Sequence, residues 1–288
     1  HGALQHVSVF LPFPQRAHFF PWFLSPLLVC SLTGGFLWSC SVVEQRGGGV
    51  NMLGVFSGTI VAPPEELVAA GSRTPSPKTK ASELVAKFLE ATAPAVSVRV
   101  GDGDGHLAYS HLNESPYNPR SFAVKDDIFC LFEGVLDNLG SLRQHYGLSK
   151  NTNEVLLVIE AYKALRDRAP YPPSHMLGHL RGNFAFLVFD RLTSTLFVAS
   201  DPAGKVPLYW GITADGYVSF ANDVNLLKDA CGKSLASFPQ GCFYSTSQGG
   251  LKSYENPKYK VTAIPAPEEE ICGATYKVEG ATIFADMH

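Results

Sequence analysis

The chain has 288 residues, of which 45% are hydrophobic and 17% charged, so it is long enough to bury one large core or two smaller ones. Its formal net charge of -3 provides no basic field for phosphates, which excludes nucleic acid as an expected partner. Six cysteines without a C-x-x-C pair argue against a zinc cage or a small disulfide scaffold and favour a reducing compartment.

The first part of the chain differs in composition from the rest. Residues 17–43 contain no Asp, Glu, Lys or Arg, and this length of apolar chain could span a bilayer. Pro21 and Pro26 interrupt the helix that a membrane span requires. A removed or spurious leader, a targeting segment and a membrane anchor remain open interpretations. We expect residues 1–51 to be a leader, disordered, spurious or removed, and we do not expect a membrane partner.

A second beginning follows at Met52, where a run of strand-forming residues starts. Prolines ahead of two acidic residues, with a glycine stop, predict a short helix over residues 63–71. Apolar residues at helical spacing predict another helix over residues 82–92. Beyond it, alternating residues on both sides of a Gly-Asp-rich turn predict a hairpin over residues 95–110.

The middle of the chain combines strands and helices. Residues 128–132 are predicted as a buried strand, residues 135–146 as a helix that stops at Gly147, and residues 153–168 as an amphipathic helix before a polar, proline-rich loop. Short strands then follow at residues 184–189, 195–199, 208–210, 217–220, 241–245 and 276–278. This inventory predicts an α+β fold of two antiparallel sheets covered by helices.

Two patterns resemble metal sites, but neither is complete. The acidic turn that begins at Asp102 has Asn113 where an EF-hand loop requires a carboxylate. His175 and His179 have the spacing of a zinc helix, but no glutamate follows the first histidine and two prolines precede it. We expect neither a metal nor another cofactor.

The order of motifs resembles the glutaminase domain of class II amidotransferases such as asparagine synthetase. The corresponding segments are Leu53-Gly54-Val55-Phe56-Ser57, Phe132-Glu133-Gly134-Val135-Leu136, Gly182-Asn183-Phe184-Ala185-Phe186 and residues 200–210. A closer resemblance is to the plant aluminium-induced or stem-specific proteins with YGL and LRDR motifs, which here are Tyr146-Gly147-Leu148 and Leu165-Arg166-Asp167-Arg168. The resemblance implies a four-layer αββα sandwich of the N-terminal-nucleophile hydrolase type over residues 52–288.

The same resemblance implies that the reaction has been lost. The enzymes attack glutamine with a cysteine thiolate, and Leu53 occupies that position. Glu133 replaces the asparagine that helps to stabilise the oxyanion, and an ionised carboxylate has no proton to donate. We expect no catalytic residue and a degenerate pocket that contains Leu53, Gly54, Glu133, Gly134, Asn138 and Thr152.

Two other nucleophiles and the two family motifs leave alternatives. Ser57 and Cys130 are candidate nucleophiles, although strand packing explains both. The motif at residues 165–168 is either a recognition patch or a solvated helix end, where cations meet the helix dipole favourably. Tyr146-Gly147-Leu148 is interpreted as a helix stop.

These observations favour a non-catalytic protein with a binding or regulatory role in plant stress or hormone responses. The alternative is an amidohydrolase of the N-terminal-nucleophile type with a non-standard nucleophile and an unknown substrate. The partner is expected to be an unidentified protein or small molecule, a homodimer remains open, and the expected location is the cytoplasm or also the nucleus.

Overall fold

The computed structural model describes residues 51–73, 76–92, 94–110, 121–168 and 171–279. The chain divides into two compact units, residues 1–47 and 48–288, and the described residues all belong to the second. The expected leader therefore lies outside the described residues, except for Asn51. None of the helices in the described ranges combines the length and apolar character of a membrane span.

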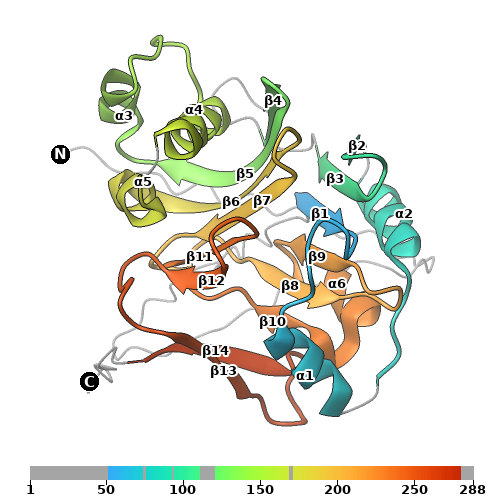
Figure 1. Ribbon diagram of the computed structural model, residues 1–288. Helices are drawn as coiled ribbons and strands as arrows, with labels where there is room; N and C mark the ends of the chain where they lie inside the picture. Colours follow the sequence, from blue (N-terminus) through green and yellow to red (C-terminus); the bar gives the residue numbers. More distant parts are fainter. Residues whose placement is uncertain (1–50, 74–75, 93, 111–120, 169–170, 280–288) are drawn as a thin grey trace, which may run out of the picture. The chain divides into compact units, whose positions relative to one another are not determined.

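Two sheets form the centre of this unit (Figure 1). One sheet has eight strands, in the order β13 (Val261–Pro265), β14 (Ala274–Val278), β10 (Ala236–Ser237), β8 (Tyr209–Ile212), β9 (Val218–Ala221), β1 (Met52–Phe56), β3 (Gly105–Ser110) and β2 (Ala95–Val100). The other has six, in the order β12 (Gly250–Ser253), β11 (Cys242–Ser245), β7 (Thr195–Ser200), β6 (Gly182–Asp190), β5 (Ile128–Leu136) and β4 (Phe122–Lys125). The pairings are antiparallel except for the parallel pair β10 and β14.

Three hydrophobic clusters show that the sheets and helices form four layers. The inter-sheet cluster contains Phe56 and Trp210 from one sheet and Leu187 from the other. A second cluster lies between the six-stranded sheet and the helices α3 (Leu139–His145), α4 (Glu154–Asp167) and α5 (Pro173–His179). A third lies between the eight-stranded sheet and the helices α2 (Ala81–Ala91) and α6 (Val224–Cys231). The predicted αββα architecture is therefore confirmed.

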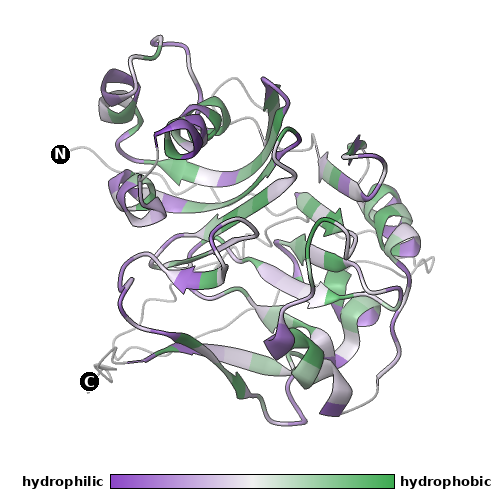
Figure 2. Ribbon diagram, in the orientation of Figure 1, coloured by the Kyte–Doolittle hydropathy of each residue, from purple (hydrophilic) through white to green (hydrophobic). Residues whose placement is uncertain are grey.

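Strand periodicity distributes the side chains between these clusters. In β5, Leu131 belongs to the inter-sheet cluster and its neighbour Phe132 to the cluster beneath α4, as expected for a strand buried on both faces. Figure 2 shows the same distribution, with mostly hydrophobic residues on β5, β6 and β7 and more hydrophilic ones on α3 and α4. The remaining helices, α1 (Glu65–Arg73) and the 3-10 turn η1 (Gly232–Ser234), contact each other beside β8.

Several predicted boundaries were wrong. The first helix spans Glu65–Arg73 and continues past Gly71, where a stop was expected. The helix expected over residues 135–146 begins only at Leu139, because β5 continues to Leu136 and pairs along its whole length with β6. Gly134 and Gly182, with φ of 118° and 132°, let the two backbones approach closely there. The expected proline-rich loop contains α5, which has Pro173 in its first turn, where a missing N–H costs little.

Candidate functional site

Leu53, which the resemblance places at the position of the nucleophile, lies in strand β1, an interior strand of the eight-stranded sheet between β9 and β3. Its side chain is 0% exposed and packs in the cluster that includes Phe88 of α2 and Leu227 of α6. Its neighbour Met52 instead belongs to the inter-sheet cluster, as does Phe56. The leucine is therefore enclosed in apolar packing beneath the helices that cover this sheet.

The start of β1 is joined to both sheets by hydrogen bonds. The side-chain oxygen of Asn222, directly after β9, accepts from the backbone N–H groups of Asn51 at 3.0 Å and Met52 at 3.3 Å. The Asn51 amide donates to the Glu133 carboxyl of β5 at 3.2 Å. The structure thus brings Glu133 to the start of β1, as the resemblance implies. The two asparagines were not predicted, because their role depends on pairing across 82 to 171 residues of sequence.

Glu133 is a carboxylate in a partly enclosed setting. Burial raises the pKa of Glu133, and the hydrogen bond from Asn51 opposes that effect. When ionised, the carboxylate accepts hydrogen bonds and cannot donate one to an oxyanion. Gly134, the next residue, has no room for a side chain, since a Cβ there would lie 2.0 Å from the Asn183 carbonyl oxygen.

Two other residues of the expected pocket form hydrogen bonds elsewhere. The Asn138 side chain donates to the His179 carbonyl at 2.8 Å and accepts from the Arg181 N–H at 3.1 Å, which ties α3 to the end of α5. The Thr152 carbonyl accepts from the Arg143 guanidinium at 2.6 Å. These contacts hold the loops around α3, and neither residue bonds to Glu133 in the hydrogen bonds found among described residues.

The alternative nucleophiles lie in settings that do not activate them. The Ser57 hydroxyl pairs at 2.5 Å with Thr59, whose hydroxyl donates to Asp104 at 3.0 Å. This relay contains two hydroxyls and a carboxylate, and no imidazole. Cys130 is 0% exposed, and burial raises the pKa of its thiol far above the ordinary value, which removes the reactive thiolate at neutral pH.

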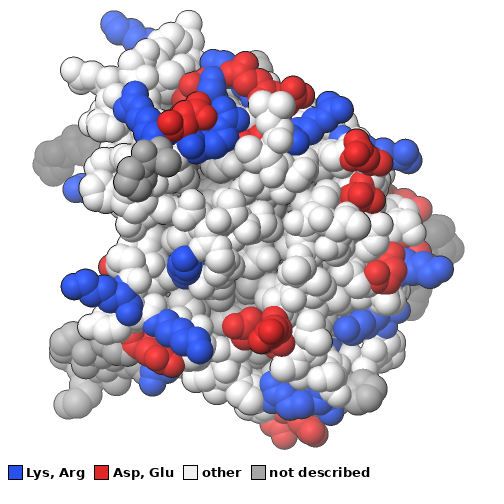
Figure 3. Space-filling view, viewed as in Figure 1, with Lys and Arg blue, Asp and Glu red and all other residues white. Residues whose placement is uncertain are grey.

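The LRDR motif ends α4, but it is more than a solvated helix end. The Arg166 guanidinium bonds to Asp167 at 2.7 Å and, from its other side, to Asp190 at 3.0 Å. Asp190 is 0% exposed and also accepts from the Leu192 N–H at 3.0 Å and the Tyr162 hydroxyl at 3.4 Å. Hydrogen bonds to Asp167 and Asp190 raise the pKa of Arg166 despite its partial burial. Figure 3 shows acidic and basic side chains intermixed over α4 and β4.

The YGL motif performs the predicted local role. Gly147 has φ of 66° and follows the last turn of α3, and the Leu148 N–H bonds to the Arg143 carbonyl at 2.7 Å. Tyr146 lines a cavity of about 540 Å³ together with Asp167 and Arg168, so residues of the YGL and LRDR motifs lie around the same cavity.

Three histidines border the same cavity: His145, His175 and His179. The rings of His175 and His179 lie 6.3 Å apart between centroids. The described parts of the chain contain no group of three or more His, Cys, Asp or Glu side chains arranged to hold a metal.

The fold and the start of β1 together define an α+β protein in which a central strand presents its first residues beside Glu133. The chain belongs to the aluminium-induced protein family, whose model matches residues 53–278. The stem-specific protein TSJT1 of Nicotiana tabacum is 45% identical over 150 residues, which cover 51% of this chain and 99% of that protein.

Weaker similarities extend to amidotransferases. Asparagine synthetase [glutamine-hydrolyzing] 2 of Arabidopsis thaliana is 39% identical over 87 residues, which cover 30% of this chain and 15% of the synthetase. A solved structure of glutamine phosphoribosylpyrophosphate amidotransferase from B. subtilis, complexed with ADP and GMP, superimposes with a TM-score of 0.47 at 13% identity. That superposition covers 70% of this chain and 48% of the enzyme.

Proposed function

We propose that this protein is a non-catalytic, amidotransferase-like protein that acts by binding a protein or a small molecule. The observation that carries the proposal is the position of Leu53, whose aliphatic side chain is 0% exposed at the place of the nucleophile. We propose a regulatory role in plant stress or hormone responses, and the description of the family as aluminium-induced supports the stress part of this proposal.

Two further observations support the loss of catalysis. An attack on an amide requires an atom with a free electron pair, and Leu53 has none. The loss of one oxyanion donor costs enzymes roughly a hundredfold to a thousandfold in rate, and the Glu133 carboxylate, when ionised, has no proton to donate in its place. Of the alternative nucleophiles, Ser57 reaches a carboxylate, that of Asp104, only through the Thr59 hydroxyl, and burial raises the pKa of the Cys130 thiol.

The test is ammonia release from glutamine by the purified full-length chain, with an active asparagine synthetase as the positive control. We expect the wild-type rate to equal the blank and to stay there in Leu53→Ala. Release above the blank that survives in Leu53→Ala would contradict the proposal. The variants Ser57→Ala and Cys130→Ala would then identify the nucleophile of the alternative amidohydrolase, with Ser149→Ala as a control at an exposed serine.

A further inference from the structure

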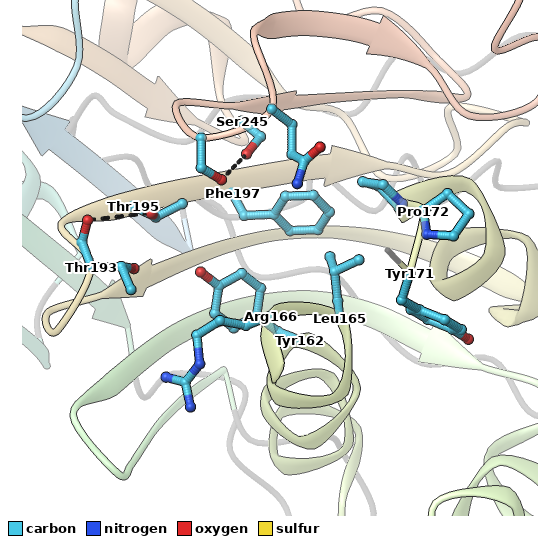
Figure 4. A pocket seen from close by; sticks show the side chains of 12 residues that line it. Tyr162, Leu165, Arg166, Tyr171, Pro172, Thr193, Thr195, Phe197 and Ser245 are labelled. Carbon is cyan, nitrogen blue, oxygen red and sulfur yellow. Dashed lines mark hydrogen bonds between the residues drawn. The ribbon is translucent and has the colours of Figure 1, made fainter. Parts of the chain in front are cut away.

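A second cavity, of about 680 Å³, lies between the helical layer and the edge of the six-stranded sheet. Figure 4 shows the Phe197 ring of β7 at its centre, with Tyr162 and Leu165 of α4 on one side and Ser245 of β11 on the other. Its volume lies within the roughly 300 to 1,000 Å³ that small-molecule sites occupy. The first two residues of the LRDR motif line this cavity.

The lining combines an apolar, aromatic floor with hydroxyl groups at the walls. Phe197 and Leu165 are only 1% and 7% exposed, so the floor is fixed by the core beneath α4. Tyr171 and Pro172 close one end, and Thr193 and Thr195 lie at the other (Figure 4). Rigid aromatic and proline surfaces suit a flat apolar ligand, and hydroxyls can both donate and accept hydrogen bonds to orient it.

The charges at this cavity are already matched. Arg166 is the cation in its lining, and its guanidinium is bonded to Asp167 and to the fully buried Asp190. Burial raises the pKa of Tyr162 to about 12, so its phenol is uncharged at neutral pH. A charged ligand would have to compete with these pairs and lose its hydration, whereas an uncharged ligand meets neither cost.

The six-stranded sheet separates this cavity from the start of β1. Phe197 and Phe132 both face the helices, whereas Glu133, next to Phe132 in β5, faces the opposite side because side chains alternate along a strand. A ligand here would therefore not contact Glu133, and the site does not depend on whether the protein is catalytic.

We infer that this cavity is a binding site for a small, uncharged aromatic molecule that carries a hydroxyl or carbonyl group. The aromatic part lies on Phe197 beside Leu165 and Pro172, and the polar group bonds to the hydroxyls of Ser245 or Thr195 at the cavity walls. Ser245 and Ser247 already pair at 3.2 Å, which places two adaptable hydroxyls at one wall.

The test uses 2-naphthol as the uncharged probe and 2-naphthoate as the charged probe of the same shape. Both are titrated into the full-length chain at about pH 7 and followed by probe fluorescence and ligand-detected NMR. We expect saturable binding of 2-naphthol and at least tenfold weaker binding of 2-naphthoate. Ser247→Trp, which fills the cavity from an exposed turn, should weaken 2-naphthol binding at least tenfold.

Two variants serve as controls. Ser149→Trp adds the same ring at an exposed serine outside the cavity and should bind 2-naphthol like the wild type. Glu133→Gln lies across the sheet and should also leave binding unchanged. The inference is overturned if 2-naphthol does not saturate, if 2-naphthoate binds as tightly, if Ser247→Trp retains full affinity, or if Glu133→Gln removes it. None of these results depends on ammonia release, so this inference and the proposed function can fail separately.

Discussion

Replacing Arg166 by methionine tests how the LRDR motif contributes to the fold. The change keeps the apolar stem but removes the cation that pairs at 3.0 Å with the fully buried Asp190. The removal of one partner from a fully buried ion pair costs about 3–5 kcal/mol. The Arg166 side chain is 23% exposed, and Asp190 keeps the Leu192 N–H and the Tyr162 hydroxyl, so we expect a smaller loss. From the usual contribution of hydrogen bonds to charged groups, we expect Arg166→Met to lower the free energy of unfolding by about 2–3 kcal/mol.

The measurement is urea unfolding followed by tryptophan fluorescence, to which the fully buried Trp210 contributes. In a separate thermal unfolding experiment, a loss of about 2–3 kcal/mol should lower the melting temperature of a unit of this size by roughly 4–12 °C. The matched control is Arg168→Met at the same helix end, because the exposed Arg168 side chain forms none of the ion pairs found among the described residues, and the loss should stay below about 1 kcal/mol. In a double-mutant cycle with Asp190→Asn, the coupling energy should reach about 1 kcal/mol or more. Equal small losses in Arg166→Met and Arg168→Met would refute the reasoning and restore the solvated-helix-end interpretation.

Three further predictions follow from burial and backbone geometry. Gly134→Ala should lower the free energy of unfolding by at least about 3 kcal/mol or prevent folding, because the added Cβ would lie 2.0 Å from a carbonyl oxygen. The control Gly140→Ala, in open space on α3, should be neutral or stabilise by about 0.5–1 kcal/mol, and chemical denaturation of both variants measures the difference. Burial raises the pKa of Glu133, so the folded state binds its proton more tightly and stability falls as the pH rises above about 4.5. The stability of Glu133→Gln relative to the wild type should therefore increase as the pH rises above about 4.5, and a stability difference that does not change with pH would contradict this reasoning. Burial raises the pKa of Cys231 to about 11 and of Cys242 to about 12. Iodoacetamide should therefore label the half-buried Cys272 well before the buried Cys130, Cys231 or Cys242, as followed by peptide mapping. Early labelling of Cys130 would contradict its packing.

The sequence alone predicted the elements whose signals are local. The turn after α3 was foreseen because Gly147 needs a left-handed backbone, and α4 because its apolar residues recur at helical spacing. Asn153 caps the start of α4 in the structure, where its side chain accepts from the Leu156 N–H at 3.1 Å. Val135 was placed in a helix because an apolar residue fits both periods, and only its pairing with Asn183 decides for the strand. The strand β4 was missed because its pairing with β5 defines it. The short helix α6 was also missed, although Asp223 caps its start by accepting from the Asn225 N–H at 2.7 Å.

The site was predicted only in part. The order of motifs indicated that Glu133 would lie near the start of β1, and the hydrogen bond from Asn51 agrees with this. Spacing along the chain could not show that Leu53 faces the helices, because that depends on which face of β1 each neighbouring layer covers. The partner of Arg166 lies 24 residues away in sequence, and no local signal marks Asp190 as buried. The cavity at Phe197 likewise joins three separate segments of the chain.

The loss of the attacking group is tested most directly by a glutamine-mimicking diazoketone, 6-diazo-5-oxo-norleucine, which alkylates working amidotransferases at their nucleophile. The full-length chain is incubated with the reagent beside an active asparagine synthetase, and intact masses are measured for both. We expect the synthetase to gain one adduct while this protein keeps its mass, because Leu53 offers no electron pair to the electrophile. A stoichiometric adduct that maps to any residue at the start of β1 or to Ser57 would contradict the account.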